Sequence, residues 1–129
     1  MKFLSLDEVL KIHRDQIDRY GGTPEVRDEG LLKSAIEIAM PMAQFGGAYL
    51  HATPAEMAGA YLYHLACNHA FVDGNKRVAA VTARVFLMLN GYRFDPPAED
   101  FERLILDVAS ATLTKEQVAT FIQQHISDA

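Results

Sequence analysis

One stretch of this sequence is apolar on nearly every side of the helix that it predicts. The segment VAAVTARVFLMLN covers residues 78–90, and Gly91 directly after it is a typical helix C-cap. The helix is expected to begin near Asn75. A helix that is apolar nearly all round belongs in the centre of a bundle, where other helices cover it. We therefore expect the fold class to be all-α.

The rest of the chain also consists mostly of helix signals, separated by glycine and proline. Three polar residues are predicted helix N-caps: Ser5, Thr53 and Thr114. The expected helices lie near residues 6–20, 29–40, 54–68, 75–90, 98–109 and 115–127. This pattern predicts a compact bundle of about six helices with at most a short β-flap, placed in the glycine-containing segment 45–53. Residues 92–95 are expected to be a short extended piece.

Length and composition are those of one domain that can fold without disulfides or a structural metal. The chain has 129 residues, of which 50% are hydrophobic. A domain of this size buries roughly two-thirds of the surface that its unfolded chain exposes, which is enough for it to fold without metals or disulfides. Cys67 is the single cysteine, which excludes an internal disulfide. We therefore expect a single domain over residues 1–129.

The charge of the chain excludes several classes of function. Twelve basic residues stand against 17 acidic ones, so the formal net charge is −5. A nucleic-acid binder normally carries a basic stripe, and anionic membranes attract basic surfaces. The sequence has neither a signal peptide nor an apolar stretch of membrane-spanning length. We expect a cytoplasmic domain with no direct nucleic-acid partner and no membrane partner.

The segment HAFVDGNKR, residues 69–77, lies between the two helices with the clearest signals. Its turn contains Gly74 and Asn75 and leads straight into a helix N-terminus. Free backbone N–H groups and the positive end of the helix dipole favour an anion there. Lys76 and Arg77 add positive charge at the same end, although each cation costs the helix a few tenths to about 1 kcal/mol. Two cations in succession therefore indicate that an anion binds at this turn.

Two other side chains of the segment could supply a metal ligand and a base, which a group transfer also needs. Asp73 is a hard oxygen ligand of the kind that Mg²⁺ takes when it bridges phosphates. His69 carries an imidazole, the side chain that most often accepts the proton of a hydroxyl group. Each residue alone would be ordinary in a loop. A base, a metal ligand and a phosphate cradle within nine residues together indicate phosphoryl or nucleotidyl transfer. Phe71 is expected to face inward and to pin the loop to the core.

The segment resembles the signature loop of the Fic/Doc family, whose Fic branch has the pattern H-x-F-x-[D/E]-G-N-G-R-x-x-R. The matching positions are His69, Phe71, Asp73, Gly74, Asn75 and Arg77. Two positions depart from the Fic branch, since Lys76 replaces a glycine and Ala80 replaces the second arginine. The Doc branch has N-K-R at this place, as this chain does. RYGG at residues 19–22 is also similar to Doc toxins, and the resemblance covers nearly the whole chain.

The resemblance implies a small helical domain that binds ATP and Mg²⁺ at this loop. By motif position, His69 would be the general base that acts on a target hydroxyl, and Asp73 would hold Mg²⁺. Gly74 and Asn75 would help to form the phosphate nest, and Arg77 would contact phosphate. These are the roles that the family assigns to matching positions.

The resemblance also implies the reaction and the partners. Doc-branch toxins transfer the γ-phosphate of ATP to a threonine of the translation elongation factor Tu, whereas Fic-branch enzymes attach AMP to a protein hydroxyl. We expect the Doc reaction, because Lys76 changes both the space and the charge where the phosphates must lie. The inhibitory pattern [S/T]-x-x-x-E-[G/N] has only a near miss at residues 112–117. We therefore expect a Phd-like antitoxin whose disordered tail folds as a helix into a groove.

Other interpretations stay open at this point. Transfer of AMP is the nearest alternative, and a non-catalytic binding module that keeps the loop as a relic is a different class. A metal hydrolase would need His64 together with His69 and Asp73, but the two histidines are five residues apart and do not share a helix face. Cys67 is expected to be a buried structural thiol rather than a nucleophile.

Overall fold

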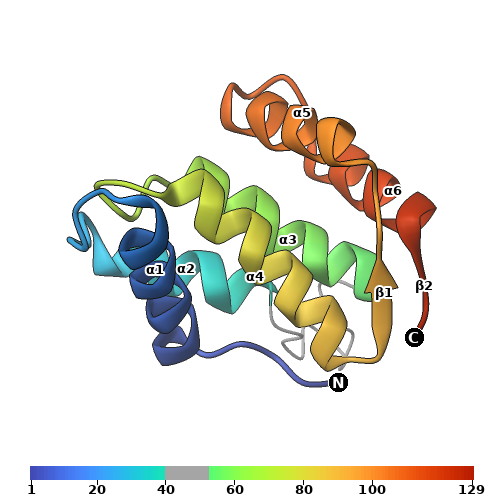
Figure 1. Cartoon of the computed structure of the whole chain (residues 1–129), viewed down its shortest axis with the longest axis horizontal. Coiled ribbons are helices and arrows are strands. Elements are labelled where there is room, and N and C mark those ends of the chain that lie inside the picture. The colour runs from blue at the N-terminus through green and yellow to red at the C-terminus, as the bar shows by residue number, and fades with distance from the viewer. Residues whose placement is uncertain (40–52) are drawn as a thin grey trace, which may run out of the picture.

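The computed structural model describes residues 1–39 and 53–129 of the chain (Figure 1). The elements are α1 (Leu6–Tyr20), α2 (Glu29–Ala39), α3 (Pro54–Cys67), α4 (Asn75–Leu89), β1 (Tyr92–Phe94), α5 (Ala98–Ala109), α6 (Lys115–His125) and β2 (Ile126–Asp128). The predicted all-α bundle is confirmed. The predicted β-flap at 45–53 lies outside the described residues except for Thr53, as does the end of the second helix, which was expected at residue 40.

The predicted N-caps are present and explain where three helices begin. Ser5 accepts a hydrogen bond from the backbone N–H of Glu8, whose carboxylate accepts one from the N–H of Ser5. Thr114 and Gln117 form the same reciprocal box at the start of α6. Thr53 caps α3, with a proline in the first helical turn. Each cap satisfies N–H groups that a helix N-terminus otherwise leaves free.

Helices α3 and α4 form the centre of the bundle. They pack along each other, with α1 and α2 on one side of the pair and α5 and α6 on the other (Figure 1). The loop that joins α3 to α4 contains the first residues of the segment 69–77. Within the described ranges, no helix is long and apolar enough to cross a membrane.

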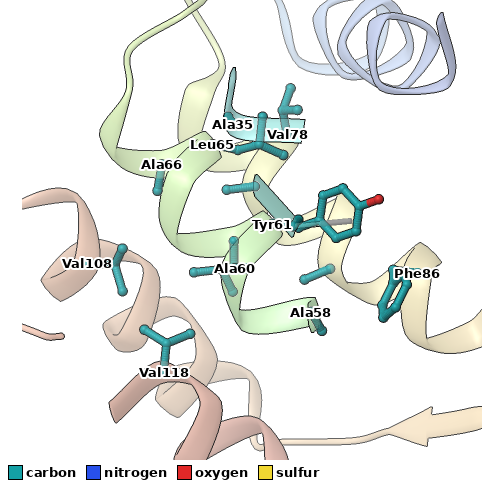
Figure 2. Close-up of a cluster of buried hydrophobic side chains, with 14 of the residues drawn as sticks. Ala35, Ala58, Ala60, Tyr61, Leu65, Ala66, Val78, Phe86, Val108 and Val118 are labelled. Atoms are coloured by element: carbon teal, nitrogen blue, oxygen red, sulfur yellow. The ribbon is translucent and has the colours of Figure 1, made fainter. Parts of the chain in front are cut away.

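The core is built mainly from α3 and α4. Figure 2 shows Tyr61 of α3 beside Phe86 of α4, and their ring centroids are 5.3 Å apart. Small residues of α3 allow α6 to come close, since a Cβ at Gly59 would lie 3.3 Å from the backbone nitrogen of Ala119. The end of α4 is less covered than its apolar sequence predicts: the Met88 side chain is exposed.

The C-terminal residues differ from the prediction. The last helix, expected to reach residue 127, ends at His125, and Ile126–Asp128 instead forms β2. This strand pairs antiparallel with β1, so that Phe94 lies opposite Ile126. The predicted extended piece at residues 92–95 is thus one half of a small sheet. Helix periodicity could not predict the other half, because the pairing strands are about thirty residues apart in the sequence.

Candidate active site

The loop between α3 and α4 turns its side chains in two directions. His69 has a left-handed backbone with a φ of 52°, which is uncommon for a residue other than glycine. Its side chain is exposed, whereas the next residues, Ala70 and Phe71, are buried. Phe71 therefore pins the loop to the core, as predicted. The strained backbone at His69 is of the kind that often occurs at functional sites.

The side chain of Asn75 closes this loop. Its Oδ1 accepts a hydrogen bond from the backbone N–H of Phe71 at 3.0 Å, and its Nδ2 donates to the carbonyl of Phe71 at 2.9 Å. The amide group is therefore occupied by the protein itself. What Asn75 can offer to a phosphate is its backbone N–H at the start of α4.

A second segment holds the loop from outside. The backbone N–H groups of Arg27 and Asp28 both donate to the carbonyl of Ala70, at 2.7 and 3.0 Å. The N–H of Val72 donates to the carbonyl of Glu25 at 3.1 Å. These bonds form a short bridge between residues 25–28 and the loop, so the loop backbone is fixed on both sides.

One pocket brings all the predicted site residues together. Its volume is about 400 Å³, within the range of small-molecule sites. Its wall contains His69, Val72, Asp73, Gly74, Asn75, Lys76 and Arg77, with Ala66 of α3 and Ala109 of α5. The sequence segment is thus folded around a single hollow.

The start of α4 offers backbone donors to this pocket. Gly74 is the N-cap, with a left-handed φ of 86° and no side-chain cap. Among the described residues, the N–H groups of residues 74–77 have no hydrogen-bond acceptor. A left-handed residue followed by helical ones makes successive N–H groups converge into an anion-binding nest. The backbone therefore fits a phosphate group.

The charges of α4 agree with this geometry. Every other helix in the described part of the chain carries an acidic residue in its first turn, and α4 carries none. Lys76 and Arg77 stand there instead, and the Lys76 side chain is exposed. An acid stabilises a helix N-terminus, so its absence here leaves the positive end of the dipole available to an external anion.

Asp73 is held in place by the turn that follows α1. Its Oδ2 accepts a hydrogen bond from the backbone N–H of Thr23 at 2.9 Å. The described residues contain no group of three or more side chains that could hold a metal ion. Mg²⁺ bound with a nucleotide uses one or two carboxylates, substrate phosphates and water, so one fixed carboxylate beside a phosphate nest fits that ion.

Arg77 has protein partners that the sequence did not reveal. Its guanidinium donates to the carbonyls of Gln16 and Gly21, at 3.3 and 3.1 Å, and lies 6.0 Å from the centre of the Tyr20 ring. A cation at the C-terminal end of α1 stabilises the dipole of that helix. The side chain thus ties α1 to α4 at the edge of the pocket. Its remaining N–H groups are what it can offer to phosphate.

The glycines of the RYGG segment have a physical role here. Gly21 is the C-cap of α1, with a φ of 86°. Gly22 has a φ of 113°, and a Cβ on it would lie 3.0 Å from Cδ1 of Ile17 and 3.1 Å from Cβ of Asp73. Gly22 therefore gives Asp73 the room to reach the N–H of Thr23.

Sequence reasoning missed His13. This α1 residue is only 2% exposed, and its ring stacks on Phe71 with centroids 3.8 Å apart. Its Nε2 lies 2.9 Å from the carbonyl oxygen of Asp73. Since a carbonyl only accepts, Nε2 carries the proton and donates it. Burial lowers the pKa of His13 and favours the neutral ring. The available signal was its helical spacing from Val9 and Ile17 on the buried face.

His64 and Cys67, the residues of the metal-hydrolase and nucleophile alternatives, both contact other parts of the protein. The Lys115 Nζ is 3.4 Å from Nε2 of His64, and the Tyr63 ring packs edge-on against the His64 ring. The Cys67 thiol donates a hydrogen bond to the carbonyl of Val108 at 3.4 Å, and burial raises its pKa. A thiol with a raised pKa is a poor nucleophile, so the geometry favours the structural interpretation of Cys67.

Together the fold and the site define a helical protein in which a histidine-containing loop leads into a helix N-terminus with the geometry of an anion site. The family model described as Fic/DOC family matches residues 3–87. The chain therefore belongs to the Fic/DOC family, and the resemblance of the loop is confirmed.

Two curated relatives are similar over most of the chain. It is 38% identical to Toxin Doc of Mycolicibacterium smegmatis over 102 residues, which are 78% of this chain and 77% of the relative. It is 32% identical to Protein kinase doc of Escherichia phage P1 over 126 residues, which are 96% and 95% of the two chains. Both relatives carry the name Doc, which supports the predicted Doc branch.

Proposed function

We propose that this protein is the toxin of a toxin–antitoxin pair and transfers the γ-phosphate of ATP to a hydroxyl side chain of a translation factor. A threonine of elongation factor Tu is the expected target, and its modification would arrest growth. The observation that carries the proposal is the pocket in which an exposed His69 lies near the start of α4, whose first N–H groups have no acceptor among the described residues. The names Toxin Doc and Protein kinase doc of the two relatives support it.

The residues divide the work of the reaction as follows. The imidazole of His69 accepts the proton of the target hydroxyl as its oxygen forms a bond to the γ-phosphorus. The bond between that phosphorus and the bridging oxygen breaks, and ADP leaves. Asp73 would hold Mg²⁺, which supplies charge neutralisation for the phosphates when it is bound. Backbone N–H groups of residues 74–77 orient the phosphates, and Lys76 and Arg77 add positive charge.

Lys76 supports phosphate transfer over AMP transfer. Its side chain lines the pocket where the Fic-branch pattern has a glycine. An ammonium group on a long side chain changes both the volume and the charge of this wall. A nucleotide in a different orientation would then offer its γ-phosphate, rather than its α-phosphate, to the hydroxyl that His69 activates.

A toxin of this kind needs an inhibitor. The near match to the inhibitory pattern, residues 112–117, includes Glu116, which stands in the first turn of α6 as an ordinary helix-stabilising acid. We therefore assign inhibition to a separate Phd-like antitoxin. Its disordered tail would fold as a helix on this protein, with the ordering cost that such binding carries.

A pair of labelling reactions tests the proposal. Purified protein is incubated with cell extract and Mg²⁺, with ATP labelled at the γ-phosphate in one tube and at the α-phosphate in the other. We expect one protein band labelled from the γ-position only. His69→Ala is the control, and we expect it to lose the band because the hydroxyl then has no base.

The same assay with Lys76→Gly tests the role of the lysine. If Lys76 sets the nucleotide orientation, this variant gains label from the α-position. A band labelled from the α-position with the unchanged protein would instead make it an AMP transferase. The lack of a band from either position would favour a non-catalytic binding module.

A further inference from the structure

His13 contacts the active-site loop from behind. It lies on α1, sixty residues before Asp73, and it lines a hollow between α1 and residues 24–26 rather than the pocket of His69. Nothing in the proposed reaction uses its imidazole. Yet the ring is buried, lies flat on Phe71 and donates to the backbone of Asp73.

The hydrogen bond has a geometric consequence for the next residue. A trans peptide group is planar, so its C=O and N–H point in opposite directions. The carbonyl of Asp73 points at His13, and the N–H of Gly74 in the same peptide therefore points away from α1. That is the side on which the pocket lies, since Ala66 of α3 and Ala109 of α5 line the pocket and no residue of α1 does.

The orientation of this peptide decides what the pocket presents to an anion. As observed, the N–H of Gly74 joins those of residues 75–77, and none of them has an acceptor among the described residues. If the peptide were reversed, the carbonyl oxygen of Asp73 would face the pocket instead. A carbonyl dipole there would repel phosphate and would remove one donor from the nest.

We propose that His13 is a positioning residue of the transfer site: it locks the peptide between Asp73 and Gly74 so that the Gly74 N–H faces the bound phosphate. The inference rests on the proposed function, because that function supplies the phosphate. His13 acts through the loop and touches neither nucleotide nor target.

The ring of His13 combines two properties that this place needs. Its flat face fits Phe71, with an angle of 11° between the two rings, and its edge carries a donor at hydrogen-bond distance from the carbonyl. Two substitutions separate these properties. His13→Phe keeps a flat ring on Phe71 and removes the donor. His13→Gln removes the ring and places an Nε2 donor at a similar distance from the backbone.

The sequence offers a selective probe of this peptide. Asp73–Gly74 is the one Asp–Gly pair in the chain. Cell-free synthesis with carbonyl-¹³C aspartate and ¹⁵N glycine therefore yields a single cross-peak that reports the Asp73 carbonyl and the Gly74 amide. Thermal unfolding of each variant confirms beforehand that it is folded.

The first readout uses no ligand. A hydrogen bond changes the chemical shift of the carbonyl carbon that accepts it. We expect the Asp73 carbonyl shift to move in His13→Phe and to stay close to its original value in His13→Gln. An unchanged shift in His13→Phe would overturn the inference, whatever the activity of the protein.

The second readout follows the Gly74 amide during titration with ATP and Mg²⁺. We expect the chemical shift of the Gly74 amide to change on addition of ATP to the unchanged protein. We expect ATP to bind about tenfold more weakly to His13→Phe, as for the loss of one charge-assisted hydrogen bond. His13→Gln should restore most of the affinity, and His69→Ala should keep the response although it cannot transfer phosphate. Equal affinity in His13→Phe and the unchanged protein would contradict the inference.

The two proposals fail in different ways. If the Gly74 amide of the unchanged protein does not respond to ATP, the proposed function is wrong at this site, and the positioning role falls with it. If that amide responds and His13→Phe binds ATP equally well, only the role of His13 is wrong.

Discussion

Asp73 depends on a residue that has no side chain. Its carboxylate reaches the N–H of Thr23 because Gly22 leaves space beside it. Gly21, the preceding residue, also has a positive φ, but a Cβ there would meet nothing within 4 Å. Both glycines therefore need a positive φ, but only at Gly22 would a Cβ press against Asp73. That difference allows the positioning of Asp73 to be tested separately from backbone strain.

We predict that Gly22→Ala lowers both stability and transfer. Alanine at a φ of 113° costs about 1–3 kcal/mol, and the close contacts with Ile17 and Asp73 add about 1–3 kcal/mol. A displaced Asp73 carboxylate should reduce transfer by about 100-fold, as small errors in catalytic geometry do. Denaturant unfolding and the labelling reaction measure the two effects.

Gly21→Ala is the matched control for this prediction. It should show the backbone strain, about 1–3 kcal/mol because φ is 86° and ψ is 173°, and retain most of the transfer activity. If both substitutions reduced transfer equally, the contact between Gly22 and Asp73 would have no special role.

The candidate site was predictable from sequence only where its residues are contiguous. His69, Asp73 and Lys76 lie in one segment, so a turn that leads into a helix already places them together. The partners of Arg77 and Asp73 lie in and after α1, fifty or more residues earlier. No local pattern connects such distant groups, and His13 looked like any residue on the buried face of a helix.

Among the helices, α4 is the one described helix whose first turn lacks the acidic residues that stabilise a helix N-terminus. Other described helices have acids in the first turn, whereas α4 has two cations and a glycine cap without a side-chain acceptor. Natural sequences depart from local rules mainly at functional sites. The N-terminus of α4 is therefore less stable than it could be, and it is available to an anion.

We predict that Lys76→Glu stabilises the protein and abolishes transfer. The substitution replaces an unfavourable cation by a favourable acid at the helix N-terminus, which is worth about 0.5–1 kcal/mol. The same carboxylate repels phosphate from the pocket. Thermal unfolding should show a higher Tm, and the gain should shrink in high salt because the side chain is exposed.

Lys76→Gln separates charge removal from charge reversal. Its stability should lie between those of the unchanged protein and Lys76→Glu. A Lys76→Glu protein that is less stable than the unchanged one, or that still transfers phosphate, would contradict the electrostatic account of α4.

The starts of three helices were predictable from the sequence, whereas the pairing of the two distant strands was not. Ser5, Thr53 and Thr114 are caps because their hydroxyls bond to N–H groups three residues later. That interaction is local and leaves a signature in the sequence. The pairing of β2 with β1 depends on contacts between distant segments, and so the last helix was expected to be longer than it is.

For the molecule as a whole, the N-terminal two-thirds holds the site. The family match at residues 3–87 contains α1, residues 25–28, the loop and nearly all of α4. All the hydrogen bonds that position the loop lie inside that range. Helices α5 and α6 pack against α3, and α5 adds Ala109 to the pocket wall. The site thus lies mainly on the loop and the start of α4, and α1 holds both in place.

The central claim is that this loop transfers the γ-phosphate of ATP to a translation factor. The most direct measurement is the intact mass of purified elongation factor Tu after incubation with this protein, ATP and Mg²⁺. We predict a mass increase of one phosphate group, located on a threonine and lost with His69→Ala. An increase of one AMP group, or an unchanged mass, would contradict the account.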